Sequence, residues 1–182
     1  MIPTIETERL ILRAYAIEDF DAYAEMWADP DVVRFIGGKP FDREASWSRF
    51  LRKAGSWSLL GFGFFAIEEK ATGLLAGEAG FHEARRILEP SIEGTLEAGW
   101  ALAPNVQGWG YATEAMTAAI SWAETAFRGR AMTCIIDPDN QPSIRVARRI
   151  GFTETARTHY RDSPITVFER RPDEKGAPEG AP

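Results

Sequence analysis

The first quarter of the chain carries apolar residues at helical spacing. The positions i, i+3, i+4 and i+7 of its first predicted helix are Phe20, Tyr23, Ala24 and Trp27. This spacing is typical of an amphipathic helix. A short second helix is predicted after Asp29-Pro30, because Asp caps helix starts and Pro fits the first turn. A third helix is expected to begin after Asp42 and to end at Gly55.

The middle of the chain changes to the short apolar runs of strands. Residues 61–69 and 74–81 predict a hairpin, and residues 95–102 predict a further strand. Residues 112–127 return to helical spacing, with a stripe of small side chains. The other predicted elements are a strand at 9–15, a strand at 131–136, a helix at 143–150 and strands at 153–158 and 165–170.

This order of elements predicts an α/β fold with one mixed sheet and helices on both faces. We expect a single domain over residues 1–171 and a disordered tail over 172–182, which has no apolar anchor. No apolar run approaches the ~20 residues of a membrane span. The N-terminus also lacks a basic-then-apolar leader, so we expect a cytoplasmic protein without a membrane partner.

Composition narrows the possible chemistry. One cysteine, Cys134, and two histidines provide no disulfide framework or cysteine-based zinc cluster, and we expect no metal. The net charge of −6 is uneven, because residues 1–127 carry 11 Lys/Arg and 19 Asp/Glu whereas residues 128–171 carry 9 and 5. Such an acidic chain is a poor nucleic-acid binder. Its basic C-terminal third could hold a nucleotide-bearing cofactor, or it could be a solvated arginine-rich face.

A glycine-containing turn precedes the predicted helix at 112–127. It reads Gln107-Gly108-Trp109-Gly110-Tyr111-Ala112. Glycines at a helix start let backbone N–H groups turn toward a phosphate, which the helix dipole also favours. The turn lacks the Gly-Lys-Ser/Thr of a triphosphate-binding loop and the three glycines of a dinucleotide fingerprint. Alone, it therefore indicates only a phosphate at a helix start.

Three features together resemble the GNAT N-acetyltransferase superfamily, closest to its RimJ/RimL-like branch. They are the Gln-x-x-Gly-x-Ala pattern at 107–112, the preceding strand that ends before Pro104, and the segment Asn140 to Ser143 that opens the next helix. The resemblance covers residues 6–170. It implies a mostly antiparallel sheet that is splayed between the strands at 95–102 and 131–136, with acetyl-CoA as cosubstrate in the gap. Relatives often form homodimers, and a homodimer is expected here.

The resemblance also implies the residues that bind the cosubstrate. The strand backbone at 100–102 would face the pantetheine arm, and the amides of 108–113 would hold the pyrophosphate. Arg149 could reach the adenosine 3′-phosphate. The complete expected set is Trp100, Ala101, Leu102, Gln107, Gly108, Trp109, Gly110, Tyr111, Ala112, Thr113, Asn140, Ser143 and Arg149.

Acetyl transfer to an amine requires a neutral amine and a leaving thiolate that is protonated or tolerated. Glu97 is the candidate base, because strand alternation places it beside the small residues Gly99 and Ala101. The structural alternative is a carboxylate paired with an arginine. Ser143 is the candidate acid, or a hydroxyl that bonds the departing sulfur. Its alternative is a first-turn serine that satisfies a backbone group.

Other residues carry weaker expectations. Many relatives have a tyrosine acid seven residues after the asparagine, where this chain has Ala147. His82 is expected on the surface and Cys134 in the core. Trp27 and Trp47 could narrow an acceptor pocket.

The expected function is an N-acetyltransferase that acts by direct attack of a primary amine, either a protein N-terminus or a small molecule. The missing tyrosine keeps a second hypothesis open, a non-catalytic acyl-CoA-binding or sensing module. A nucleotide- or RNA-binding protein is disfavoured by the acidic first 127 residues.

Overall fold

Helices begin where the sequence supplies a side-chain cap. In the computed structural model, which describes residues 1–171, the side chains of Asp29, Asp42 and Asn140 accept hydrogen bonds from backbone N–H groups two or three residues later. The helices that follow are α2 (Pro30–Val33), α3 (Arg43–Leu60) and α5 (Gln141–Arg149). The remaining helices are η1 (Ile17–Asp19), α1 (Phe20–Ala28), η2 (Pro104–Val106) and α4 (Tyr111–Ala126). The tail predicted at 172–182 lies outside the described residues.

The predicted end of the third helix was wrong. Helix α3 continues through Gly55 and ends at Gly61, whose φ of 75° and N–H bond to Trp57 O form a left-handed C-cap. The additional turn carries Trp57 onto the sheet, where its ring packs 4.9 Å from that of Phe65. Burial of this indole offsets the small penalty of a glycine inside a helix.

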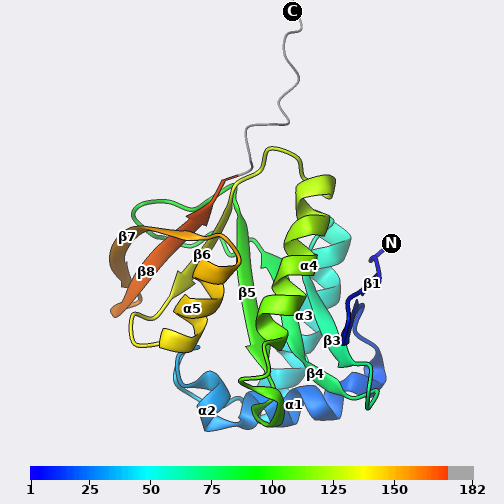
Figure 1. The fold of residues 1–182 in the computed structure, drawn as a ribbon. Helices are drawn as coiled ribbons and strands as arrows, with labels where there is room; N and C mark the ends of the chain where they lie inside the picture. Colours follow the sequence, from blue (N-terminus) through cyan, green and yellow to red (C-terminus); the bar gives the residue numbers. More distant parts are fainter. Residues whose placement is uncertain (172–182) are drawn as a thin grey trace, which may run out of the picture.

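The sheet has eight strands in the order β1-β2-β3-β4-β5-β6-β8-β7 (Figure 1). All neighbours are antiparallel except β5 and β6, which are parallel. The two-residue strand β1 was not predicted. The strands are β1 (Ile5–Glu6), β2 (Leu10–Arg13), β3 (Phe64–Glu69), β4 (Leu75–His82), β5 (Leu96–Leu102), β6 (Met132–Ile136), β7 (Thr153–Tyr160) and β8 (Ser163–Arg170).

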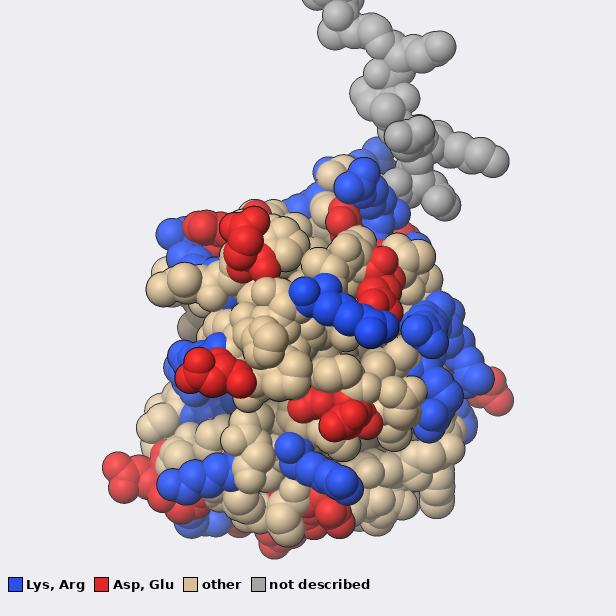
Figure 2. All heavy atoms as spheres, turned by 90° about the vertical axis from the view of Figure 1, so that its left-hand side faces the viewer, with Lys and Arg blue, Asp and Glu red and all other residues tan. Residues whose placement is uncertain are grey.

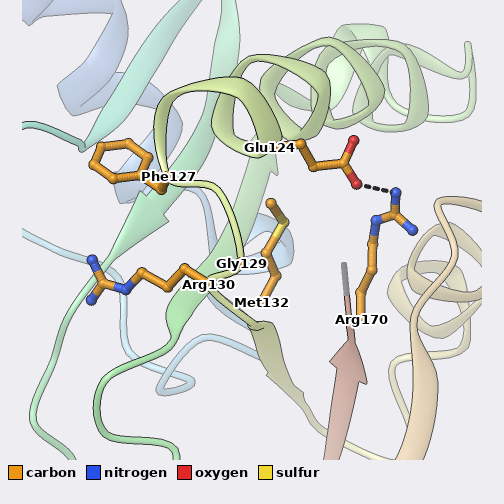
Figure 3. Close-up of a pocket in the computed structure, with 6 residues that line it drawn as sticks. All are labelled: Glu124, Phe127, Gly129, Arg130, Met132 and Arg170. Atoms are coloured by element: carbon orange, nitrogen blue, oxygen red, sulfur yellow. Dashed lines mark hydrogen bonds and ion pairs between the residues drawn. The ribbon is translucent and has the colours of Figure 1, made fainter. Parts of the chain in front are cut away.

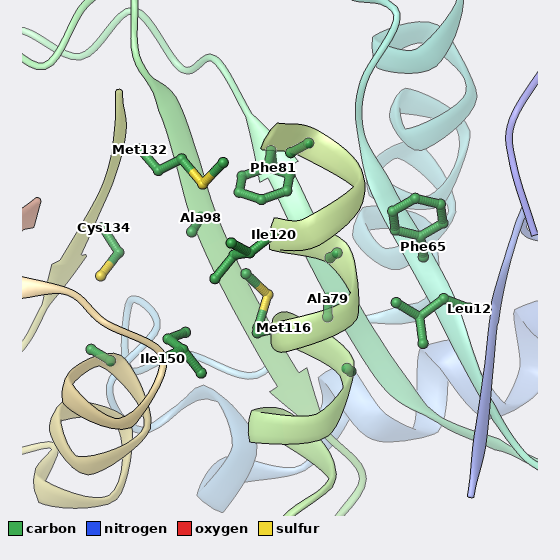
Figure 4. Packing of buried hydrophobic residues seen from close by; sticks show 14 of the residues in the cluster. Leu12, Phe65, Ala79, Phe81, Ala98, Met116, Ile120, Met132, Cys134 and Ile150 are labelled. Carbon is green, nitrogen blue, oxygen red and sulfur yellow. The ribbon is translucent and has the colours of Figure 1, made fainter. Parts of the chain in front are cut away.

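Helices cover both faces of the sheet, as predicted. Helices α4 and α5 lie on one face, where Phe65, Phe81 and Met132 pack with Met116 and Ile120 of α4 (Figure 4). The buried small-residue stripe of α4 consists of Ala112, Ala115, Ala119 and Ala123. The opposite face meets α1 and α3 (Figure 1). Within residues 1–171, no helix combines the length and apolar character needed to cross a bilayer.

The parallel strands β5 and β6 pair only at their first residues. Leu96 pairs with Met132 and Glu97 with Thr133, and the strands then diverge (Figure 1). Beyond that point β5 continues to pair with β4, and β6 with β8. The sheet is therefore splayed between the two strands for which the family resemblance implied it.

Candidate active site

The splay leaves two strand edges facing each other without a ladder. Ala103 N donates to Ala76 O on β4 at 2.9 Å. Because backbone direction alternates along an antiparallel strand, Ala101 also points to β4, whereas Trp100 and Leu102 point toward β6. Ala101 was expected to turn its backbone toward the cosubstrate. Its backbone instead belongs to the β4 ladder, and its side chain packs in the cluster around α1.

The glycine turn lies at the open end of the splay. Gly108 and Gly110 have φ values of 83° and 85°, and a Cβ on Gly108 would have no atom within 4 Å. Gln107 Nε2 donates to Leu102 O at 3.1 Å, which ties the turn to the end of β5. The first α4 residue whose N–H bonds back into the helix is Glu114, to Gly110 O. The amides of residues 111–113, which precede it in the helix, have no partner within the helix and are available to a ligand.

Arg9 and Glu114 hold this turn in place. Arg9 NH1 donates to Trp109 O at 2.9 Å, and its Nε donates to Glu114 Oε2 at 2.7 Å. Thr7 Oγ1 and Arg9 N donate to the other carboxylate oxygen. Burial acts to raise the pKa of Glu114, but these donors outweigh it and hold the pKa below its ordinary value. Glu114 thus anchors the turn to the N-terminal strands.

At the closed end of the splay, Glu97 lies between Arg86 and His82. Arg86 Nε donates to both carboxylate oxygens at 2.9 Å, and His82 Nε2 lies 3.2 Å from Oε1. Burial acts to raise the pKa of Glu97, but interactions with His82 and Arg86 hold it below its ordinary value. Arg86 also stacks on the Tyr160 ring at 4.7 Å. The arginine-paired carboxylate weighed as the alternative is therefore what the structure contains.

The environment of Glu97 differs from the expected open space. The Phe64 ring fills the position above Gly99, where a Cβ would lie 2.9 Å from Phe64 Cζ. His82 is the last residue of β4, opposite Glu97, and is only partly exposed, whereas it was expected on the surface. Its side chain is 30% exposed, and it lines a small hollow together with Glu97, Arg86 and Thr95. Among residues 1–171, His82 Nδ1 makes no hydrogen bond.

Comparison with known proteins identifies the family to which this chain belongs. The family model of the acetyltransferase (GNAT) domain matches residues 9–153. The chain belongs to the GNAT acetyltransferase family. The N-acetyltransferase p20 of Bacillus licheniformis is 29% identical over 150 residues, 82% of each chain.

Two solved structures are similar to that of this chain. An acetyltransferase from Agrobacterium tumefaciens has 32% identity and a TM-score of 0.80, and the match covers 93% of this chain and 95% of that one. RimL, a ribosomal alpha-N-protein acetyltransferase solved in complex with coenzyme A, has a TM-score of 0.75 at 17% identity, with 93% and 98% covered. The second likeness concerns the fold alone. GNAT acetyltransferases use acetyl-CoA.

Helix α5 places the remaining predicted residues of this GNAT domain. Asn140 caps the helix by accepting from Ser143 N at 3.2 Å, so it is the Ser143 backbone that satisfies the cap. Ser143 Oγ is half-buried and makes no hydrogen bond within residues 1–171. Arg149 is exposed and has no ion pair there either. Cys134 is 1% exposed, and burial raises the pKa of its thiol, so it is part of the core as expected.

A buried polar cluster on the α1–α3 face escaped the sequence reading. Glu78, in the middle of β4, accepts from Lys53 Nζ at 2.8 Å and from Tyr15 Oη at 2.9 Å, and Arg49 lies 3.8 Å away. The available signal was a single carboxylate in an otherwise apolar strand, which requires a partner when it is buried. Arg86 was missed because it lies in the loop between β4 and β5.

Two acidic residues near the start of the chain are paired with arginines. Of the early acidic residues, Asp19 pairs with Arg13 and Asp21 with Arg43. On the face shown in Figure 2, basic and acidic side chains are interspersed.

A second small hollow lies at the C-terminal end of α4, lined by Glu124, Arg130 and Arg170 among others (Figure 3). It is at the closed end of the splay, away from the glycine turn.

Proposed function

We propose that this GNAT protein moves an acetyl group from acetyl-CoA to a primary amine, by direct attack in a ternary complex. The acceptor is a protein N-terminal α-amine or a small-molecule amine. One observation carries the proposal: the unpaired edges of β5 and β6 open toward the same end of the sheet as the free amides of the glycine turn. An extended arm with a pyrophosphate at its end fits both features.

The residues that would hold acetyl-CoA follow from this fit. The backbone groups of Trp100 and Leu102 face the gap and would bond the pantetheine arm. The amides of 108–113 would bind the pyrophosphate at the N-terminus of α4. Asn140 and Ser143 lie at the start of α5, and the exposed Arg149 is available to the 3′-phosphate.

We propose His82 as the proton acceptor, with Glu97 as the group that orients it. Both oxygens of Glu97 already accept from Arg86, so Glu97 has little capacity to receive a proton. A proton on His82 Nε2, directed at Glu97, leaves Nδ1 as the ring nitrogen that can accept a proton. This arrangement is a histidine oriented by a carboxylate.

The proposed transfer balances as follows. The amine nitrogen forms a bond to the thioester carbon while the carbon–sulfur bond breaks, and the amine proton passes to His82 Nδ1. A gap-facing N–H of Trp100 or Leu102 donates to the carbonyl oxygen. The departing thiolate accepts a hydrogen bond from Ser143 Oγ. A peptide α-amine, with a pKa near ~8, is more readily deprotonated than a lysine near ~10.4.

Initial rates test the order of events. With acetyl-CoA and an amine both varied, thiol release is expected to give intersecting double-reciprocal lines, because both substrates are bound before transfer. Parallel lines would indicate an acyl-enzyme and contradict direct attack.

Replacing Gly108 by Ala is expected to weaken coenzyme A binding about tenfold or more, which is the effect of losing one charge-assisted hydrogen bond. Alanine is strained at the φ of 83°, and its methyl would lie on the surface that meets the pyrophosphate. Isothermal titration with coenzyme A measures the change. Gly129→Ala is the matched control, because Gly129 has a φ of 78° and also no atom within 4 Å of a Cβ. Equal dissociation constants for the two variants would contradict the assignment of this turn.

Replacing Ser143 by Ala is expected to lower kcat about tenfold, the effect of a hydrogen bond to a charged group. The melting temperature should be unchanged, because Asn140 caps the helix through the Ser143 backbone. Ser143→Thr retains the hydroxyl and should retain activity. An unchanged kcat in Ser143→Ala would remove the serine from the mechanism.

A further inference from the structure

Hydrogen-bond donors without acceptors gather between α1 and α3. They are Tyr23 Oη, Trp27 Nε1, Ser46 Oγ and Arg49 Nε, all buried; the Trp27 and Ser46 atoms have no hydrogen-bond partner among the described residues, and Tyr23 has only the Arg49 guanidinium beside it. Tyr23, Trp27 and Ser46 are no more than 1% exposed. Buried polar groups are nearly always hydrogen-bonded. Donors without an acceptor within one pair of packed helices therefore require an explanation.

The four atoms lack the same kind of partner. The Trp27 and Arg49 nitrogens can only donate, and the two hydroxyls can donate. The Arg49 guanidinium lies 4.0 Å from the Trp27 ring and 5.3 Å from that of Phe41, which fixes its plane. Ser46 lies one helical turn before Arg49, on the same side of α3. The missing partner is thus an acceptor.

The local charge favours an anion. The carboxylate nearest to Arg49 belongs to Glu78, 3.8 Å away, but Glu78 is already paired with Lys53 at 2.8 Å. Arg49 is therefore a cation in excess of the carboxylates around it. Arg52, one turn further along α3, has no ion pair within residues 1–171. The carboxylates of Asp19 and Glu68 both pair with Arg13.

The cluster also lies on the face from which an acceptor would approach. Glu78 is directly opposite Ala101, and opposed residues of an antiparallel pair point to the same face. Ala101 and Glu97 are four residues apart on β5, so they share that face. Arg49, His82 and Glu97 are thus all on the α1–α3 side of the sheet.

We propose that Arg49 binds a carboxylate carried by the amine acceptor, with Tyr23, Trp27 and Ser46 as further donors behind it. This specificity rests on the proposed acetyl transfer. The Arg49 side chain is 24% exposed, so an arriving carboxylate meets the guanidinium first. The other donors come into reach as that side chain moves toward the ligand. An acidic side chain near a peptide N-terminus would supply this carboxylate, because Glu78 beside Arg49 and the proposed base His82 are four residues apart on β4, roughly 13 Å along the strand.

Binding is tested without turnover, so the result does not depend on catalysis. The indole ¹H–¹⁵N signal of Trp27, assigned with Trp27→Phe, is followed while N-acetyl-L-alanine or N-acetyl-L-alaninamide is added to the full chain with coenzyme A. The signal should shift with the carboxylate, not with the amide, and the shift should disappear in Arg49→Met. Equal shifts with both compounds, or none with either, would overturn the proposal.

Turnover identifies the source of the carboxylate. The ratio of kcat/KM for a carboxylate acceptor to that for its amide should be about 10- to 100-fold, the range of charge-assisted hydrogen bonds. Peptides with Asp or Asn at the second or third position form the carboxylate and amide pairs, so the position that gives the larger ratio identifies the source. Arg49→Met should bring the ratio near 1, Arg49→Lys should keep part of it, and the control Arg52→Met should keep it. Turnover at a ratio of 1 in the unmodified protein would overturn the subsite alone, whereas absence of turnover with every amine would overturn the proposed function.

Discussion

Replacing His82 by Gln is expected to lower kcat/KM for acetyl transfer by about 10²- to 10⁴-fold, the contribution typical of a general base. The glutamine amide can still donate to Glu97, but it cannot accept a proton from the amine. The side chain of His82 is 30% exposed, so its replacement should change the free energy of unfolding little. Coenzyme A binding should also be unchanged, because His82 is not part of the glycine turn.

The control for this variant is His159→Gln, at the chain's only other histidine. His159 is exposed and near the end of β7, so activity should stay at the level of the unmodified protein. The pH profile adds a second readout. Loss of the general base should remove the limb of the kcat/KM profile that reports its protonation. An unchanged rate and profile in His82→Gln would contradict the assignment.

Replacing Glu97 by Gln is expected to lower the free energy of unfolding by about 3 kcal/mol, because it leaves a buried guanidinium without its anion. The side chains of Glu97 and Arg86 are 6% and 17% exposed. Chemical denaturation measures the loss. Glu97→Gln combined with Arg86→Met should recover part of it, since the uncompensated charge is removed as well.

Glu97→Gln should also change how the free energy of unfolding depends on pH. The pKa of Glu97 is lowered in the folded protein, as burial is outweighed by His82 and Arg86. The unfolded chain therefore binds the proton first on acidification, so the pair stabilises the fold above the ordinary carboxyl pKa of about 4.3 and loses this contribution as the pH falls below it. Glu97→Gln should flatten the acid dependence of stability. Glu93→Gln, at an exposed carboxylate in the loop that carries Arg86, should leave it unchanged, and an equal effect of both variants would contradict the pairing.

Local signals explain why so much of the fold could be predicted. The caps at Asp29, Asp42 and Asn140 act on residues two or three positions away, so the sequence alone contains both partners. The end of α3 is different. Whether Gly55 ends the helix depends on whether Trp57 finds a place on the sheet, and that depends on packing with residues far along the chain.

The candidate site likewise contains features that local sequence predicts and features that depend on distant residues. The glycine turn and its cap residues were recognisable, because Gly108 and Gly110 are adjacent to the helix that they begin. The partners of Glu97 depend on strand register and on the course of a loop, since His82 lies opposite it on β4 and Arg86 lies in the connection. The pairing of Lys53 with Glu78 likewise joins a helix to a strand. Periodicity shows that such residues are buried, but it does not show which of them meet.

Amine-dependent release of thiol from acetyl-CoA tests the central claim most directly. Short peptides that begin with Ser or Ala, free amino acids and polyamines are each supplied with acetyl-CoA, and the acetylated amine is counted by mass spectrometry. The account predicts that thiol and acetylated amine appear in equal amounts with at least one class of primary amine, and that His82→Gln suppresses both. Acetyl-CoA that raises the melting temperature yet yields no acetylated amine from any class would contradict it, and would favour the sensing module in its place.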